Sequence, residues 1–160
     1  MLDGPSVAAA LKGCGVTHVV WIPDSELGTW DQALSSDSDL QLIRVCREGE
    51  AIAVAAGLML GGKHPVVAIQ CTGLFEAGDS LRNIVHDMKL PIFMIVGLRG
   101  YYAYQQKKTS DTCPVFAEPI LKAWQIPYTI LENRHTAADL AHAYRQAQAE
   151  NRAAAVCLAE

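Results

Sequence analysis

Hydrophobic and polar positions change their pattern along the chain, and short apolar runs alternate with longer stretches of mixed character. Six of the apolar runs carry many β-branched residues and predict strands over 17–22, 40–45, 66–71, 91–96, 128–131 and 154–158. These runs show little polar alternation, which is typical of strands buried on both faces. We therefore expect a parallel sheet at the centre of the fold.

The stretches between the predicted strands carry helical patterns. The first helix begins at Asp3-Gly4-Pro5 and ends at the glycines at 13 and 15. Further helices are predicted over 26–34, 48–60, 80–88, 118–124 and 137–150. Pro119 suits the first turn of the helix that contains it, and the polar segment 99–113 is predicted to be a long surface loop.

Strands that alternate with helices predict an α/β fold. We expect a three-layer sandwich, with a mostly parallel sheet of about six strands and helices on both of its faces. A chain of 160 residues suits one domain, and neither an internal repeat nor a linker divides it. The sequence therefore predicts a single domain over 1–160.

Composition narrows the classes of function. Hydrophobic residues make up 51% of the chain and charged residues 19%, which indicates a globular protein. The net charge of -4 comes without a basic stripe, so we expect no nucleic-acid partner. The longest apolar stretch, 51–60, is too short to cross a bilayer, and the N-terminus lacks the pattern of a signal peptide. These features predict a cytoplasmic protein without a membrane partner.

The cysteines and histidines show no metal-binding pattern. The five cysteines form no CxxC pair and are odd in number. Cys46, Cys71 and Cys157 lie in or at the end of apolar runs, so we expect core side chains in a reducing compartment. The five histidines lack HExxH or any other zinc-ligand spacing, and no metal is predicted on this chain.

Three common functions of α/β domains find no support in the sequence. Residues 57–64 resemble a P-loop, but His64 takes the place of the magnesium-binding hydroxyl. The glycines there also close a helix and precede a strand, which is the reverse of the P-loop order. A dinucleotide-binding GxGxxG after the first strand and a GxSxG nucleophile elbow are both missing.

Candidate chemistry gathers where predicted strands end. In open parallel sheets, ligands bind beyond the carboxyl ends of the strands. Those ends carry Asp24, Glu48, Thr72 and Arg99. Glu48 and Glu50 both open a helix, and a carboxylate there commonly only complements the helix dipole, so spacing alone favours a structural role for either.

The segment CREGEAIAVAAGLMLGGKHPVVAIQCTG, residues 46–73, resembles thiamine-diphosphate decarboxylases and acetolactate-synthase-like enzymes. Aligning the family's glycine on Gly57 places its catalytic glutamate on Glu48 rather than Glu50. Residues 15–28, 89–100 and 124–131 resemble the family's first, fourth and fifth strands, so the likeness covers nearly the whole chain. It extends to the small α subunits of sulfopyruvate decarboxylase and the N-terminal domain of phosphonopyruvate decarboxylase, and implies a pyrimidine-binding (PYR) domain with the thiamine-diphosphate-binding fold.

Three turns in order make the resemblance specific: Pro23-Asp24-Ser25, Gln70-Cys71-Thr72-Gly73-Leu74 and Arg99-Gly100. Two departures concern loops expected to face the substrate. Phe75-Glu76 replaces the family's usual Gly-Asn, and tyrosines with a lysine pair follow Arg99-Gly100. These departures leave the identity of the 2-oxo acid open.

The resemblance implies roles for individual residues. Glu48 would hydrogen-bond the aminopyrimidine ring of thiamine diphosphate and favour its imino tautomer. Asp24 would handle protonation of substrate or product, and the alternative is a cap of the following helix. The remaining candidates have structural alternatives as turn, core or loop residues: Gln70, Thr72 and Gly73 for the cofactor, and Ser25, His86 and Arg99 for the substrate.

The chain lacks the Gly-Asp-Gly motif with which the family's other half binds the diphosphate through magnesium, since 78–80 reads Gly-Asp-Ser. The resemblance therefore implies a β subunit that carries the diphosphate-binding (PP) domain and the Mg²⁺, in a hetero-oligomer. We expect the α subunit of a two-chain decarboxylase, active on a small 2-oxo acid only with its partner. The alternatives are a subunit of an acetolactate-synthase-like carboligase and a non-catalytic regulatory homologue.

Overall fold

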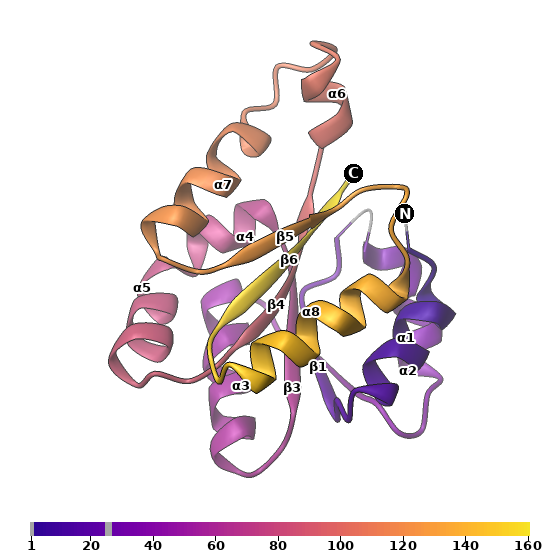
Figure 1. Ribbon diagram of the computed structural model, residues 1–160, viewed down its shortest axis with the longest axis vertical. Helices are drawn as coiled ribbons and strands as arrows, with labels where there is room; N and C mark the ends of the chain where they lie inside the picture. The colour runs from indigo at the N-terminus through magenta and orange to yellow at the C-terminus, as the bar shows by residue number, and fades with distance from the viewer. Residues whose placement is uncertain (1, 25–26) are drawn as a thin grey trace.

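The computed structural model of the chain describes residues 2–24 and 27–160. Its centre is one parallel sheet of six strands in the order β2-β1-β3-β4-β6-β5 (Figure 1). The strands are β1 His18–Trp21, β2 Gln41–Arg44, β3 Pro65–Gln70, β4 Phe93–Leu98, β5 Tyr128–Leu131 and β6 Ala154–Ala159. The predicted α/β fold with a parallel six-stranded sheet is confirmed.

Helices cover both faces of the sheet, and each face has its own hydrophobic core. One core includes side chains of α1 Gly4–Gly13, α2 Asp31–Ser35 and α8 Ala137–Ala149. The other includes side chains of α3 Glu48–Leu60, α4 Cys71–Glu76, α5 Gly78–Leu81, the π-helical turn Arg82–Asp87 and α7 Cys113–Ala123. The central strand β4 is buried along its whole length, whereas the edge strand β2 is partly exposed.

Side-chain caps explain where α1 and α8 begin. The side chain of Asp3 accepts a hydrogen bond from the Ser6 N–H, which fixes the start of α1. Thr136 and Asp139 form a capping box at the start of α8. Helix α3 spans the predicted range 48–60, and Gly61 follows it as the C-cap.

Three predicted helices differ in the structure. The segment predicted as one helix over 26–34 contains a 3-10 turn, Leu27–Trp30, and the short α2; residues 25 and 26 lie outside the described residues. Helical structure after β3 begins at Cys71 rather than at residue 80. The helix predicted over 118–124 is α7, which begins at Cys113 and has another proline at its first turn.

Pro119 therefore lies inside α7 and not at its first turn. Proline has no N–H, so the carbonyl of Val115 loses its helical partner. Val115 is 38% exposed, so water can reach this part of the helix. The segment predicted as a loop over 99–113 also contains the short helix α6 Tyr101–Gln105, which projects beyond the sheet (Figure 1).

The cysteines only partly follow the sequence-based expectation. Cys157 is buried, and this burial raises the pKa of its thiol to about 12. Cys46 is exposed, so its predicted place in the core is wrong. Cys71 lies in the core but forms a disulfide with Cys113, and the two Cα atoms are 6.6 Å apart. The bond joins the start of α4 to the start of α7.

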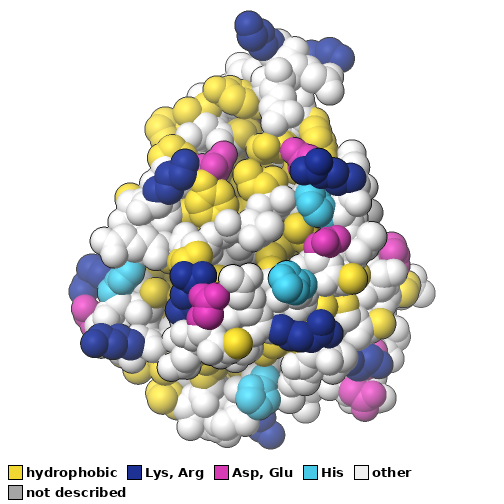
Figure 2. All heavy atoms as spheres, in the orientation of Figure 1, with side chains coloured by type: hydrophobic (Ala, Val, Ile, Leu, Met, Phe, Trp, Pro, Cys, Tyr) yellow, Lys and Arg dark blue, Asp and Glu magenta, His cyan; other side chains and the backbone are white. Residues whose placement is uncertain are grey.

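Within the described part of the chain, no helix is both long and apolar enough to cross a membrane. Hydrophobic side chains nevertheless reach the surface over α7, where Val115 and Phe116 are exposed. Figure 2 shows hydrophobic side chains in this region, below basic side chains at the tip of the molecule.

Candidate active site

The strand ends bring the candidate residues to one edge of the sheet. Trp21 of β1 pairs with Arg44 of β2 and with Ala68 of β3, so these three strands end at nearly the same level. The direction of strand addition also reverses between β1 and β3, and such a reversal is the usual ligand-binding position of an open α/β sheet. The last residue of β3 is Gln70, and the other candidates follow the ends of these strands and of β4 beside them: Asp24, Glu48, Thr72, Gly73 and Arg99.

Glu48 is the first residue of α3, and its side chain lies against the backbone of Gly73 in α4. A Cβ atom added to Gly73 would stand 2.1 Å from Cγ of Glu48 and 2.5 Å from its Oε1. Any side chain at residue 73 would therefore push the Glu48 carboxylate away. Among the residues that the structure describes, none donates a hydrogen bond to this carboxylate, which leaves its oxygens available to a ligand.

Glu50 has a different environment from Glu48. Its Oε2 accepts a hydrogen bond from the Cys46 N–H at 3.0 Å. Glu50 is exposed and stabilises the strand-to-helix turn, which is the structural role that the sequence allowed for either glutamate. The two carboxylates of the first turn thus separate into one that caps the turn and one that faces α4.

Asp24 caps the 3-10 turn that follows β1. Its Oδ1 accepts a hydrogen bond from the Leu27 N–H at 2.7 Å, and its carbonyl accepts one from the Gly28 N–H at 3.0 Å. The capping role named as an alternative is therefore present, and it holds the half-buried carboxylate at the end of β1. Ser25, the neighbouring substrate candidate, lies outside the described residues.

Gln70, Thr72 and Gly73 lie where β3 passes directly into α4. The hydroxyl of Thr72 donates to Oε1 of Gln70 at 3.0 Å, so the two polar side chains orient each other. Gly73 brings this junction into contact with Glu48. The structure therefore joins the three cofactor candidates to the catalytic candidate.

Arg99 lies at the border of this edge and His86 does not. Nε of Arg99 donates to Oδ2 of Asp111 at 3.1 Å, and Oδ1 of the same carboxylate accepts from the Cys113 N–H at 2.9 Å. The pKa of Asp111 is lowered, first by the Cys113 N–H and then by Arg99. His86 stacks on Trp124, with ring centroids 6.2 Å apart, close to the amino-terminal ends of β4 and β5. It lies at the opposite end of the sheet from Glu48.

Glu76 is a site residue that the sequence showed only as a departure from the family pattern. Its Oε2 accepts from the Gly49 N–H at 2.8 Å, and its Oε1 accepts from Nε of Arg47 at 2.9 Å. The polar replacement of a usual Gly-Asn was the only signal of this contact. No metal cluster of three or more His, Cys, Asp or Glu side chains occurs within 2–24 and 27–160.

The chain matches a known protein family over most of its length. The family model described as "Thiamine pyrophosphate enzyme, N-terminal TPP binding domain" matches residues 4–118. The chain is 32% identical over 125 residues to the sulfopyruvate decarboxylase subunit alpha of Methanococcus maripaludis. The aligned region covers 77% of this chain and 73% of that subunit. The chain is 35% identical over 100 residues to the phosphonopyruvate decarboxylase of Streptomyces viridochromogenes, covering 62% of this chain and 25% of that enzyme.

Solved structures share the fold. Benzoylformate decarboxylase from Polynucleobacter necessarius superposes with a TM-score of 0.75 at 20% identity, over 99% of this chain and 30% of that chain. The 4-hydroxybenzoylformate decarboxylase of Rhodococcus jostii gives a TM-score of 0.72 at 18% identity, over 96% of this chain and 29% of that chain. The chain thus spans under a third of these enzymes and about three quarters of the sulfopyruvate decarboxylase subunit.

Proposed function

This chain belongs to the family of thiamine pyrophosphate enzymes through their N-terminal TPP binding domain, and we propose that it is the α subunit of a two-chain decarboxylase of small 2-oxo acids. The contact between Glu48 and Gly73 at the carboxyl edge of the sheet carries the proposal. The relative of similar extent is named a subunit alpha, which supports a partner subunit. The relatives named sulfopyruvate and phosphonopyruvate decarboxylase support a 2-oxo acid with a second anionic group as substrate.

The residues at the edge fit the proposed cofactor. The side chain of Glu48 lies against the backbone of Gly73, and no described residue donates a hydrogen bond to its carboxylate, so its oxygens can accept one from a ring. Thiamine diphosphate, when bound, supplies the electron sink that lets carbon dioxide leave a 2-oxo acid. Glu48 would hydrogen-bond the aminopyrimidine ring and hold a proton at a carboxylate oxygen, and that proton exchange is its catalytic role.

The other edge residues would bind and orient. Gln70, Thr72 and Gly73 would contact the pyrimidine ring of the cofactor, and the hydrogen bond between Gln70 and Thr72 would fix the orientation of their side chains. Asp24 would exchange a proton with the substrate or product from the end of β1. Arg99, whose side chain is 49% exposed, would approach the anionic end of the substrate.

A partner chain completes the proposed site. We propose that a β subunit with the diphosphate-binding domain holds the Mg²⁺ and the diphosphate, and that the two chains form a hetero-oligomer. The sulfopyruvate decarboxylase relatives named as alpha subunits support this arrangement.

The test combines this chain with a separately produced candidate partner that carries a diphosphate-binding domain. Carbon dioxide release is measured with thiamine diphosphate, magnesium and a panel of 2-oxo acids that includes sulfopyruvate, phosphonopyruvate and pyruvate. We expect release only when both chains are present, and fastest with a substrate that carries a second anionic group. Full activity of this chain alone would overturn the two-chain proposal, and a condensation product of two pyruvates would favour a carboligase instead.

A further inference from the structure

The first turn of α3 is held by a side chain from another helix. Arg47, the N-cap residue, makes no side-chain capping hydrogen bond, because its guanidinium has no acceptor. The N–H groups of a first turn have no partner within the helix and need one elsewhere. The Gly49 N–H finds it in Oε2 of Glu76, at 2.8 Å, from the end of α4.

The same carboxylate is fixed on its other oxygen. Oε1 of Glu76 accepts hydrogen bonds from Nε and Nη2 of Arg47, with the Nε at 2.9 Å. Both contacts lower the pKa of Glu76, the Gly49 N–H more than Arg47. Glu76 is therefore ionised near neutral pH and bridges the backbone of α3 to the residue that precedes the helix.

Helix α4 meets two successive residues of α3. Gly73 contacts the Glu48 side chain, and Glu76, three residues later on the same face of α4, binds the N–H of the next residue, Gly49. Gly49 is itself closely packed, since a Cβ there would lie 3.0 Å from Oγ of Ser80 in α5. Three contacts from α4 and α5 thus define how the first turn lies.

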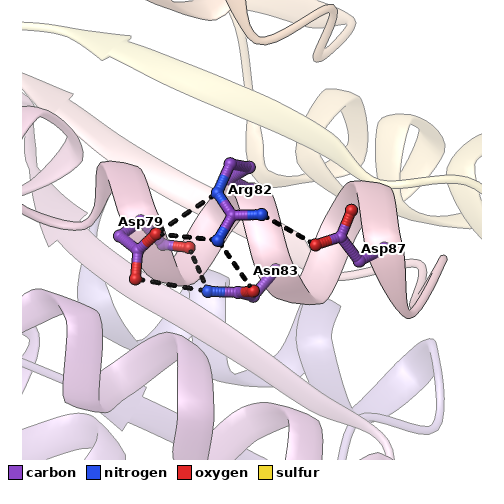
Figure 3. Close-up of polar contacts among 4 residues, drawn as sticks. All are labelled: Asp79, Arg82, Asn83 and Asp87. Atoms are coloured by element: carbon purple, nitrogen blue, oxygen red, sulfur yellow. Dashed lines mark hydrogen bonds and ion pairs between the residues drawn. The ribbon is translucent and has the colours of Figure 1, made fainter.

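Hydrogen bonds and ion pairs among polar side chains stabilise the segment around Ser80. Arg82 pairs with Asp79 and Asp87 and donates to Asn83, as Figure 3 shows. Asn83 in turn donates to the backbone carbonyl of Asp79. This network spans α5 and the π-helical turn. It therefore stabilises the segment that carries Ser80, the residue against which Gly49 packs.

We propose that Glu76 is a positioning residue that sets the place of the Glu48 carboxylate by holding the first turn of α3. The inference rests on the proposed function of Glu48. Glu76 does not contact the substrate in this role, since its two oxygens bind Gly49 and Arg47. Its effect on the reaction passes through the backbone of the turn that carries Glu48.

The test compares Glu76→Ala and Glu76→Gln with Asp139→Ala. Asp139 is the matched control, because its carboxylate also caps a helix, accepting from the Thr136 N–H at 2.7 Å, but in α8 on the other face of the sheet. Glu76→Gln keeps an oxygen for Gly49 and removes the charge that attracts Arg47. Two quantities are measured: amide hydrogen exchange at Gly49 in the full chain, and kcat and KM of the enzyme assembled with its partner.

In Glu76→Ala we expect Gly49 to exchange about tenfold faster, because one hydrogen bond of typical strength is lost. We expect kcat to fall by about 10- to 100-fold with little change in KM for the 2-oxo acid, because small misplacement of a catalytic group has effects of this size. Glu76→Gln should lie between the wild type and Glu76→Ala. Asp139→Ala should leave Gly49 exchange and kcat within about twofold.

Two results would overturn the proposal. Unchanged exchange at Gly49 in Glu76→Ala would show that Glu76 does not hold the turn. Faster exchange with a kcat equal to that of Asp139→Ala would show that the held turn does not matter for Glu48. Glu48→Gln, measured in parallel, separates the two claims, since full activity of that variant defeats the proposed function while the exchange at Gly49 still reports on Glu76.

Discussion

Glu48 at the start of α3 and Gly73 in α4 share one small volume: a Cβ at residue 73 would stand 2.1 Å from Cγ of Glu48. Gly73 has ordinary helical backbone angles, so the backbone conformation does not require a glycine there. The glycine is needed because the Glu48 side chain approaches its backbone so closely. This contact places the proposed catalytic carboxylate directly beside the end of β3.

Gly73→Ala should inactivate the enzyme while the chain still folds. The added methyl group collides with the flexible end of a side chain, which can rotate away, so the loss of stability should stay within about 1–3 kcal/mol. The displaced Glu48 should reduce kcat by about 100-fold. Thermal unfolding and carbon dioxide release with the partner chain measure the two effects.

Gly57→Ala is the control for that substitution. Gly57 lies in the same helix as Glu48, and nothing stands within 4 Å of an added Cβ. Alanine in a helix interior stabilises by roughly 0.5–1 kcal/mol relative to glycine. Unchanged activity with a slightly higher melting temperature is expected, whereas a large loss of activity would mean that glycine-to-alanine changes in this region act without contact to Glu48.

Reduction of the Cys71–Cys113 disulfide should destabilise the domain. The bond closes a loop of sequence separation 42, for which chain-entropy arguments give about 4 kcal/mol. Cys113→Ser should lower the urea midpoint, and a reductant should have no further effect on that variant. In unfolded, unreduced protein we expect thiols only from Cys14, Cys46 and Cys157. Thiol from all the cysteines before reduction would contradict the bond.

Acid should weaken the stabilisation of the first turn of α3 by the Glu76 carboxylate. The folded pKa of Glu76 lies below its ordinary value, so its stabilising effect is fully present above the unfolded pKa of about 4.3 and is lost as the pH falls through the lower folded pKa. Urea unfolding of wild type and Glu76→Gln at neutral pH and near pH 3 measures this effect. The difference between the two proteins should shrink on acidification, and a constant difference would speak against it.

Asp111 should stabilise α7 through its acceptor oxygen and hold Arg99 through its charge. Asp111→Ala removes the hydrogen bond from the Cys113 N–H and should cost about 1 kcal/mol, as loss of a helix cap does. Asp111→Asn keeps an acceptor for that N–H and should retain most of the stability. Both variants release Arg99, so both should change KM for an anionic 2-oxo acid. Equal stability of the two variants would exclude the capping role.

Sequence patterns predicted those parts of the fold whose signals are local. The alanine-rich run and Gly61 predicted α3 to its ends, and the apolar runs predicted all six strands. The start of α4 was missed because Thr72 and Gly73 favour a turn, while packing on α3 and α7 stabilises a helix there. The disulfide was missed because Cys113 follows a polar segment with no apparent partner.

In the candidate site, too, the sequence predicted what has a local signal and missed what depends on contacts between distant residues. Glu48 could be proposed from the spacing to Gly57 within a family resemblance, and the structure adds its contact with Gly73. Glu76 stood out in the sequence only as a departure from the family pattern, and its contacts with Arg47 and Gly49 could not be predicted because they join residues distant along the chain. His86 lies away from the edge because its helix precedes β4 and so ends at the amino-terminal side of the sheet.

The most direct test is carbon dioxide release by Glu48→Gln, assembled with the partner chain, thiamine diphosphate and magnesium, beside Glu50→Gln as control. Glutamine keeps the shape of Glu48 but cannot exchange the proton, so we predict a fall in kcat of about 100-fold or more. Glu50→Gln should stay within a few-fold of wild type, because Glu50 caps the turn through an oxygen that glutamine retains. Wild-type activity in Glu48→Gln would contradict the central claim that Glu48 is the catalytic residue.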